Sequence, residues 1–264
     1  MLYKALAVLV QKEISELFGP TGPQVATFGP VGEITLPYTK MGAIDSTHLF
    51  GLDELIIFAF YVVNSEHYRN VLDAGANLGL HSIVMSRCGY NVTAFEPDPF
   101  HFEQLQLNLR RNKCLSVTPI QKALSTIRGK HDFVRVVGNT TGSHLAGSKK
   151  NTYGPTNVFQ VETENFTEQL VDMDLVKIDV EGHEAKVILS VPWQQWVKTD
   201  AIVEVGNAMN AREIFSYFSG SSINLFAQGL GWKQVNTFDD MPVSYHDGSL
   251  FISAKDKMPW RVNE

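Results

Sequence analysis

The chain has 264 residues, of which 44% are hydrophobic and 19% charged, with a net charge of -6 and an isoelectric point of about 5.8. These values are sufficient for one full hydrophobic core and argue against a general attraction to nucleic acid or to an anionic membrane surface. Two cysteines are too few for a disulfide framework or a thiolate zinc site, which favours a reducing, cytoplasmic compartment.

The first 64 residues are predicted to form an N-terminal helix and a cap. Residues 5–10 are apolar, but the run is short and lacks a small-residue cleavage site, so it indicates an amphipathic helix that ends near Gly19. No stretch of the chain approaches the apolar length of a membrane span. Residues 19–39 are rich in glycine and proline and predict a hairpin or coil. Residues 53–63 predict a helix that packs close to the glycine-containing loop at residues 73–79.

The segment from residue 70 to residue 100 reads as a strand, a glycine loop, a helix, a second strand and an acidic tip. The first strand ends at Asp73, the amphipathic stretch from 80 to 87 predicts the helix, and the second strand ends in Glu96. Glycines allow a tight turn close to a ligand, and a helix start presents free N–H groups. A carboxylate at the spacing of Glu96 is typical of ribose recognition.

The glycine loop differs from the dinucleotide pattern GxGxxG. Gly75 and Gly79 are present, but Asn77 replaces the middle glycine and the third glycine is missing, so the loop is a poorer cradle for a pyrophosphate. Asp73 beside the loop suits a cationic amino group better than a diphosphate. S-adenosylmethionine offers both that amino group and a ribose, whereas the alternative is a simple turn with two solvated carboxylates.

The remaining segments continue an alternation of helices and strands. Residues 100–112 predict a helix and residues 115–124 a third strand. Residues 131–137 and 157–163 alternate like paired strands and flank a polar, glycine-rich loop, which is either a lid or a surface connection and in which His144 is expected to be solvated. Further expected elements are strands at 175–180 and 200–205, a helix at 211–218, and strands near 232–238 and 250–254 that would form a closing antiparallel hairpin.

Four acidic residues fall at the carboxyl ends of predicted strands. They are Asp73, Glu96, Asp179 and Glu204. Because ligands of open parallel sheets bind at that edge, we expect the four side chains to converge on one face.

With these motifs in place, the chain resembles the FkbM family of S-adenosylmethionine-dependent methyltransferases. The resemblance is carried by VLDAGANLG, FEPDPF and LVKIDVEGHE and runs from about residue 70 to residue 205. It implies a Rossmann-like class I methyltransferase fold, with a seven-stranded mostly parallel sheet, an antiparallel last strand and helices on both faces. It also implies O-methyl transfer to a hydroxyl, often on a sugar or glycan. The resemblance does not cover the first third of the chain, and we expect a cap over residues 1–64 followed by a methyltransferase domain over residues 65–264.

The same resemblance assigns the cofactor site. Asp73, Gly75, Asn77 and Gly79 would form the methionine end of the pocket, and Glu96 would take the ribose with Pro97 and Asp98 beside it. Ala123, in QKALS, would lie near the adenine. Asp179, Glu181 and His183 fall in the family signature KIDVEGHE, where DAGAN at 73–77 stands for the more frequent DVGAN.

A hydroxyl is a poor nucleophile, so a proton acceptor is expected near the methyl group. His183 is the first candidate, and Asp179 or Glu181 would orient it or accept the proton directly. The alternative is that Glu181 and His183 only cap the following helix. Together with Glu184 and Glu204, these residues could also hold Mg²⁺ or Ca²⁺, which is not favoured, and the absence of HExxH argues against zinc.

Two rival functions remain open at this stage. The acid at Glu96 also suits an NAD-dependent oxidoreductase. The third possibility is a non-catalytic cofactor-binding or scaffolding protein, in which the polar loop between residues 137 and 157 recognises a partner. The expected partners are a small-molecule or glycan acceptor and a second copy of the chain, without nucleic acid. Tyr153, Trp193 and Trp196 are candidates for stacking on a sugar ring, with core packing as the alternative for the tryptophans.

Overall fold

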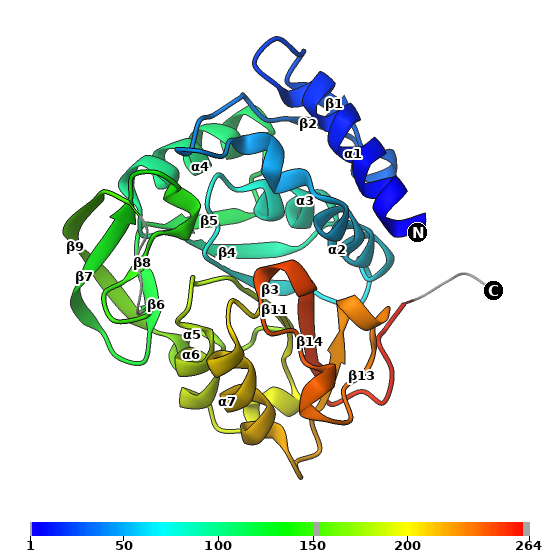
Figure 1. Ribbon diagram of the computed structural model, residues 1–264, viewed down its shortest axis with the longest axis vertical. Helices are drawn as coiled ribbons and strands as arrows, with labels where there is room; N and C mark the ends of the chain where they lie inside the picture. Colours follow the sequence, from blue (N-terminus) through cyan, green and yellow to red (C-terminus); the bar gives the residue numbers. More distant parts are fainter. Residues whose placement is uncertain (1, 150–153, 261–264) are drawn as a thin grey trace.

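A computed structural model describes residues 2–149 and 154–260 of the chain. The central feature is a twisted sheet with helices on both faces and a smaller sheet beside it (Figure 1). The helices are α1 (Leu2–Phe18), α2 (Leu52–Val63), α3 (Leu80–Arg87), α4 (Pro99–Arg111), α5 (Phe166–Gln169), α6 (Glu184–Ser190) and α7 (Ala208–Phe218). Among the described residues, no helix is long and apolar enough to cross a membrane.

The central sheet has the strand order β13-β12-β14-β11-β10-β3-β4-β5. Its members are β3 (Asn70–Ala74), β4 (Asn91–Phe95), β5 (Val117–Ile120), β10 (Leu175–Ile178), β11 (Asp200–Glu204), β12 (Asn224–Ala227), β13 (Lys233–Gln234) and β14 (Ser249–Ser253). β3, β4, β5, β10 and β11 are parallel, and β14 is inserted antiparallel between β11 and β12. This order confirms the predicted class I methyltransferase fold with its antiparallel last strand.

Two details of the predicted sheet are wrong. The sheet has eight strands rather than seven, because the two-residue β13 pairs with β12 at the edge. The last two predicted strands do not form a hairpin, since β12 lies between β13 and β14 and pairs with both. β12 was not predicted, because its four residues are too few to show a clear alternation.

A second sheet has the order β6-β9-β7-β8, with β6 (Ala123–Ser125), β7 (Gly129–Val136), β8 (His144–Leu145) and β9 (Thr156–Asn165). The antiparallel pairing of β7 with β9 confirms the two strands predicted around the polar loop. The predicted third strand at 115–124 is divided between the sheets. Its first part is β5, whereas Ala123 begins β6, which pairs in parallel with β9.

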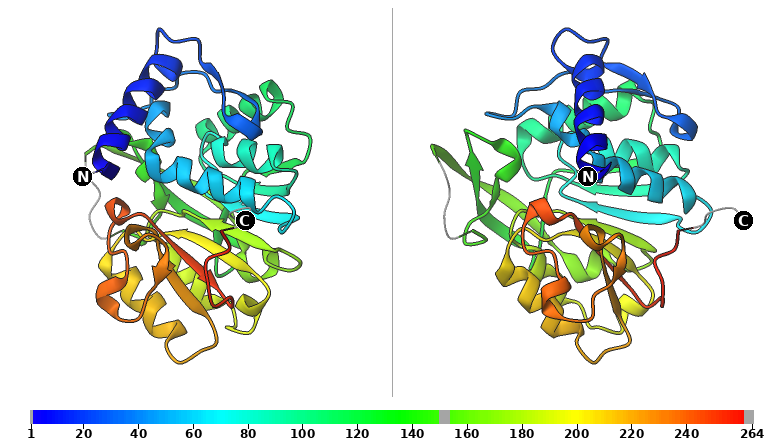
Figure 2. Two further views of the ribbon diagram at one scale, coloured as in Figure 1. Left: turned by 90° about the vertical axis from the view of Figure 1, so that its right-hand side faces the viewer. Right: turned by 45° about the vertical axis from the view of Figure 1, so that its right-hand side comes forward.

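Two hydrophobic clusters hold the layers together. Alternating side chains of the parallel strands point to opposite faces, so Val71 packs with α3 and α4 while Leu72 packs with α5 and α6. The N-terminal segment joins the first cluster through the stacked rings of Phe18 and Phe50, whose centroids are 4.5 Å apart. Figure 2 shows α1 as the outermost helix on this side.

The N-terminal segment therefore packs on the face of the central sheet that carries α3 and α4. Its residues 41–43 also contact the second sheet after β7, where the N–H of Thr140 donates to the main-chain oxygen of Met41 and the N–H of Ala43 to that of Gly138. The N-terminal segment also contains the predicted hairpin, β1 (Val25–Thr27) with β2 (Glu33–Thr35). Because it shares a hydrophobic cluster with the central sheet, the division of the chain at residues 64 and 65 stays a prediction.

Candidate active site

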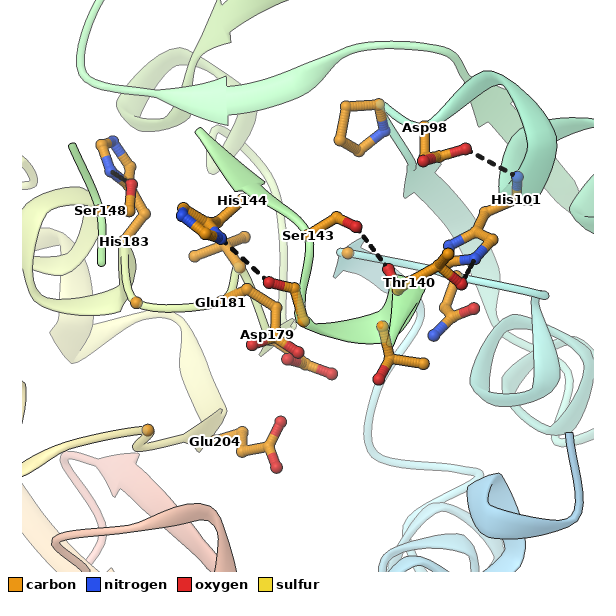
Figure 3. A pocket seen from close by; sticks show the side chains of 18 of the residues that line it. Asp98, His101, Thr140, Ser143, His144, Ser148, Asp179, Glu181, His183 and Glu204 are labelled. Carbon is orange, nitrogen blue, oxygen red and sulfur yellow. Dashed lines mark hydrogen bonds between the residues drawn. The ribbon is translucent and has the colours of Figure 1, made fainter. Parts of the chain in front are cut away.

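A cavity of about 1390 Å³ opens at the carboxyl ends of β3, β4, β10 and β11. This is the edge at which open parallel sheets bind ligands, and the volume exceeds the range of about 300–1,000 Å³ that is usual for a single small molecule. The cavity is lined by nine of the predicted site residues, namely Gly75, Asn77, Glu96, Pro97, Asp98, Ala123, Asp179, Glu181 and His183. Several of these side chains point into one open space in Figure 3.

The loop between β3 and α3 is held against the end of β10. Gly75 has a φ of +86°, and a Cβ atom at this position would lie 1.8 Å from the main-chain oxygen of Asp179. Any side chain would therefore both strain the backbone and collide with β10. Asn77 also has a left-handed backbone, with a φ of +51°, so its N–H turns toward the end of β4.

Two predicted cofactor residues lie behind the cavity rather than on its wall. Gly79 starts α3 and would collide with Leu105 if it carried a Cβ. Asp73 is fully buried and accepts a hydrogen bond of 2.6 Å from Ser82 Oγ, so three of the four strand-end acids, and not Asp73, face the cavity. The second oxygen of Asp73 and the side-chain oxygen of Asn77 are buried without a partner in the structure.

These two orphan oxygens are the observation that fits a cofactor with a cationic amino group. A buried oxygen without a hydrogen bond is costly, and an ammonium group or an ordered water at the methionine end would satisfy it. Asp73 would act on such a group from behind the loop.

Glu96 is committed to the loop backbone. Its two oxygens accept hydrogen bonds of 2.8 Å from the N–H groups of Asn77 and Asp98, and burial raises its pKa to about 8. Asp98 caps α4 and receives both guanidinium hydrogen bonds of Arg135, each at 2.6 Å. Burial opposes the ionisation of Asp98, but the hydrogen bonds from Arg135 and the nearby positive charges together outweigh it and hold the pKa of Asp98 below its usual range.

A group of acids lies across the cavity, at the ends of β10 and β11. Lys177 donates to Asp179 at 3.1 Å, and Glu204 is hydrogen-bonded to the same carboxylate. Burial disfavours the charge on Asp179, yet Lys177 lowers its pKa, while the nearby charge of Asp179 raises the pKa of Glu204 well above the usual value. The interaction therefore favours the ionised form of Asp179 and the protonated form of Glu204.

Glu181 lies two residues after Asp179 and forms an ion pair with Lys149 from the loop after β8. Burial raises the pKa of Glu181 to about 7, and the charge of Asp179 acts in the same direction. Glu181 can therefore exchange a proton near neutral pH.

His183 is placed differently from the predicted orientation. Its Nε2 lies 3.2 Å from Ser125 Oγ and its Nδ1 lies 3.0 Å from Ser148 Oγ, so the ring faces two serines rather than Asp179 or Glu181. Burial lowers its pKa to about 4, which leaves the ring neutral at physiological pH. It joins β6, the loop after β8 and the start of α6.

Residues 73–229 match the family described as the methyltransferase FkbM domain, which is more than half of the chain. The chain belongs to the FkbM methyltransferase family. This confirms the resemblance that the motifs indicated.

Two curated relatives match part of the chain. The hexuronic acid methyltransferase AglP of Haloferax volcanii is 27% identical over 154 residues, which cover 58% of this chain and 62% of the relative. The methyltransferase sdnD of Sordaria araneosa is 30% identical over 162 residues, covering 48% of this chain and 61% of the relative. The chain thus spans less than two thirds of the length of either relative.

Among solved structures, the precorrin-6y C5,15-methyltransferase of Geobacter metallireducens GS-15 matches with 12% identity and a TM-score of 0.42, over 76% of this chain and 86% of that one. The strand order of the central sheet carries the fold assignment of the FkbM domain.

Two other roles were considered for these residues, namely capping of α6 and the binding of a metal ion. His183 occupies the N-cap position of α6, but its side chain makes no capping hydrogen bond; instead, Glu184 accepts from the N–H of Gly182 at 2.8 Å. Within residues 2–149 and 154–260, no group of three histidine, cysteine or acidic side chains is arranged to hold a metal ion.

Sequence reasoning missed several residues of the FkbM cavity. Tyr245 and His246 line it from the short helix η7 (Tyr245–Asp247), Glu54 comes from α2, and His81 comes from α3. No local pattern marks them, because they approach the site only through packing.

Three expectations about side chains also have an outcome. His144 is buried rather than solvated, with Nδ1 3.0 Å from the oxygen of Gly142. Trp196 is fully buried in the core, Trp193 is half-exposed but does not line the cavity, and Tyr153 lies outside the described residues.

Proposed function

We propose that the protein transfers a methyl group from S-adenosylmethionine to a hydroxyl of a sugar or glycan. The observation that carries the proposal is the shared cavity, in which the loop at 75–77 and Glu96 face Asp179, Glu181 and Glu204. Its volume of about 1390 Å³ leaves room for a cofactor and an acceptor together. The membership of the FkbM family and the name of the curated relative AglP support the same reaction class and a sugar acceptor.

The chain's own residues divide between the two ligands. Gly75 and Asn77 would shape the methionine end, Glu96 would meet the ribose hydroxyls with Pro97 beside it, and Ala123 would form part of the adenine wall. When bound, the cofactor supplies a methyl group that a nucleophile can take. Most of the acceleration then comes from holding the acceptor oxygen in line with that group.

Asp179 is the residue we assign to the acceptor proton. It faces the cavity, and Lys177 keeps it ionised, so it can take the proton as the acceptor oxygen forms its new bond. Glu181 is the second candidate, because its pKa of about 7 lies in the working range. His183 acts as a positioning residue in this assignment, since both of its nitrogens contact serines.

The first test is calorimetric titration of the cofactor-free protein with S-adenosylhomocysteine, with NAD as the control ligand. We expect binding in the micromolar range for the first ligand alone, which is about -8 kcal/mol. Binding of NAD, or of neither ligand, would refute the cofactor assignment and return the oxidoreductase or another function to consideration.

Variants then separate the roles. Glu96→Ala should abolish binding of S-adenosylhomocysteine, whereas Asp179→Asn should leave that binding intact and lower the rate of methyl transfer by about 10²-fold or more. An Asp179→Asn variant that transfers methyl groups at the wild-type rate would remove Asp179 as the proton acceptor.

A further inference from the structure

The end of the cavity that faces β10 and β11 is the region left for the acceptor. This inference rests on the proposed function, because the glycine loop and Glu96 assign the β3 and β4 side to the cofactor. The acceptor end is lined by Asp179 and Glu181 after β10, by Glu204 at the end of β11, and by Glu54 of α2. Figure 3 shows the first three of these side chains directed toward the same space.

Each lysine that lines the described cavity is already paired with a carboxylate. Lys177 donates to Asp179 at 3.1 Å, and Lys149 forms an ion pair with Glu181. Lys122 lies 2.7 Å from Glu164 Oε1, at the adenine side. No arginine is among the described residues that line the cavity.

The histidine nearest the acids is engaged as well. His81 Nε2 lies 2.8 Å from Glu54 Oε2, and its Nδ1 lies 3.1 Å from the hydroxyl of Tyr61. To gain a lysine partner, a carboxylate on the acceptor would therefore have to displace Asp179 from Lys177 or Glu181 from Lys149, and it would lie beside the ionised Asp179. Hydroxyl and ammonium groups are donors and would meet carboxylate oxygens directly.

The mouth of the same region has an aromatic side chain exposed to solvent. Tyr245 is 64% exposed and lines the cavity from η7, with its ring 3.9 Å from that of His246. Ser244 pairs with Asn207 of the segment between β11 and α7, which fixes η7 beside the end of β11. Met209, 50% exposed, lines the cavity from the start of α7.

This combination suits one face of a sugar ring. An aromatic ring offers a large apolar surface at a low cost in conformational entropy, and it packs against the C–H face of a sugar while the hydroxyls turn toward the acids. Neither the exposed ring nor the apolar Met209 side chain would help to bind a carboxylate.

We propose that the acceptor is a sugar ring without a carboxylate, either uncharged or bearing an amine, whose hydroxyls contact Asp179 and Glu204 and whose apolar face rests on Tyr245. The specificity would then differ from the one that the name of AglP states for that relative. The charges of this chain, rather than its family, carry the assignment.

The test uses matched acceptors with the full-length protein. Aryl glycosides of glucose, galactose and mannose are compared with the corresponding uronides and 2-amino sugars, by transfer of tritium from labelled S-adenosylmethionine and by calorimetry on the protein saturated with S-adenosylhomocysteine. We expect at least one neutral or amino sugar to be used with a kcat/KM about tenfold or more above that of its uronide. A preference for a uronide, or no binding of any sugar in the panel, would overturn the proposal.

Two variants examine the residues themselves. Tyr245→Ala should raise the KM for the preferred sugar by about tenfold without changing the affinity for S-adenosylhomocysteine, whereas the control Trp193→Ala, also an exposed aromatic residue but outside the cavity, should change neither value. An unchanged KM in Tyr245→Ala would show that the sugar does not pack against the ring of Tyr245. Glu181→Gln should narrow the difference between the preferred sugar and its uronide, because it releases Lys149 to pair with the uronide carboxylate, and an unchanged ratio would overturn the argument from the paired lysines.

The two proposals fail in distinguishable ways. If S-adenosylhomocysteine does not bind, the proposed function is wrong and the acceptor comparison has no basis. If it binds and a uronide is the preferred acceptor, the methyltransferase assignment stands and only the acceptor class is wrong.

Discussion

Gly75→Ala tests whether the contact between the cofactor loop and β10 sets the geometry of the site. Gly75 has a φ of +86°, and an added Cβ would lie 1.8 Å from the main-chain oxygen of Asp179. The chain offers a matched control in Gly89, which has a φ of +87° and no neighbour within 4 Å of an added Cβ.

Both substitutions place an alanine in the left-handed backbone region, but only Gly75→Ala also brings a Cβ atom into collision with a neighbouring main-chain atom. A non-glycine residue in the left-handed region costs about 1–2 kcal/mol, which is the whole effect expected for Gly89→Ala. Overpacking against a backbone that cannot move freely adds about 1–3 kcal/mol, so Gly75→Ala should lower the free energy of unfolding by about 2–5 kcal/mol. Because relief of the collision moves the end of β10, we also expect Gly75→Ala to weaken binding of S-adenosylhomocysteine by about tenfold or more.

Urea denaturation followed by circular dichroism gives the free energy of unfolding of both variants, and calorimetry gives their affinity for S-adenosylhomocysteine. Gly89→Ala should bind the ligand as the unmodified protein does. Equal losses of stability in the two variants, or unchanged ligand affinity in Gly75→Ala, would refute the idea that the approach of Gly75 to β10 shapes the pocket.

Three further predictions follow from the charges. Glu96 has a pKa of about 8 in the folded protein against 4.5 ordinarily, so between these two values the folded state holds a proton that the unfolded state releases, and the free energy of unfolding falls as pH rises. In urea denaturation at a series of pH values, Glu96→Gln should remove up to about 1.4 kcal/mol per pH unit of this dependence. An unchanged pH dependence would count against the raised pKa of Glu96. The rate of methyl transfer should show an inflection near pH 7, because Glu181 ionises there and interacts with the charge of Asp179, the assigned proton acceptor. This inflection should disappear in Glu181→Gln and persist in His183→Ala, because the pKa of the histidine is about 4, and the opposite pattern would restore the histidine as the base. Arg135→Ala should lower the free energy of unfolding by about 3–5 kcal/mol, because it leaves the buried carboxylate of Asp98 without its cationic partner. The control Arg128→Ala, at a side chain that is 62% exposed, should cost only about 0–1 kcal/mol. Similar losses in the two variants would show that burial of the pair is unimportant.

The sequence determined the class of fold and the place of the site. The strand ending at Asp73, the loop that follows and the acid at Glu96 lie within 30 residues, so local periodicity and spacing were enough to predict a cofactor site. The carboxyl ends of parallel strands meet at one edge of the sheet, which is why the sequence alone places Asp179 and Glu204 on the same face as the loop.

The tertiary structure decided what each of these groups does. Asp73 accepts a hydrogen bond from Ser82 of α3 and does not line the cavity. His183 contacts Ser125 and Ser148, which are brought together only when β6 and the loop after β8 pack beside the sheet. The proton on Glu204 depends on burial and on the nearby charge of Asp179, neither of which follows from spacing. Tyr245 reaches the acceptor end through the insertion of β14, a long-range pairing that no local pattern encodes.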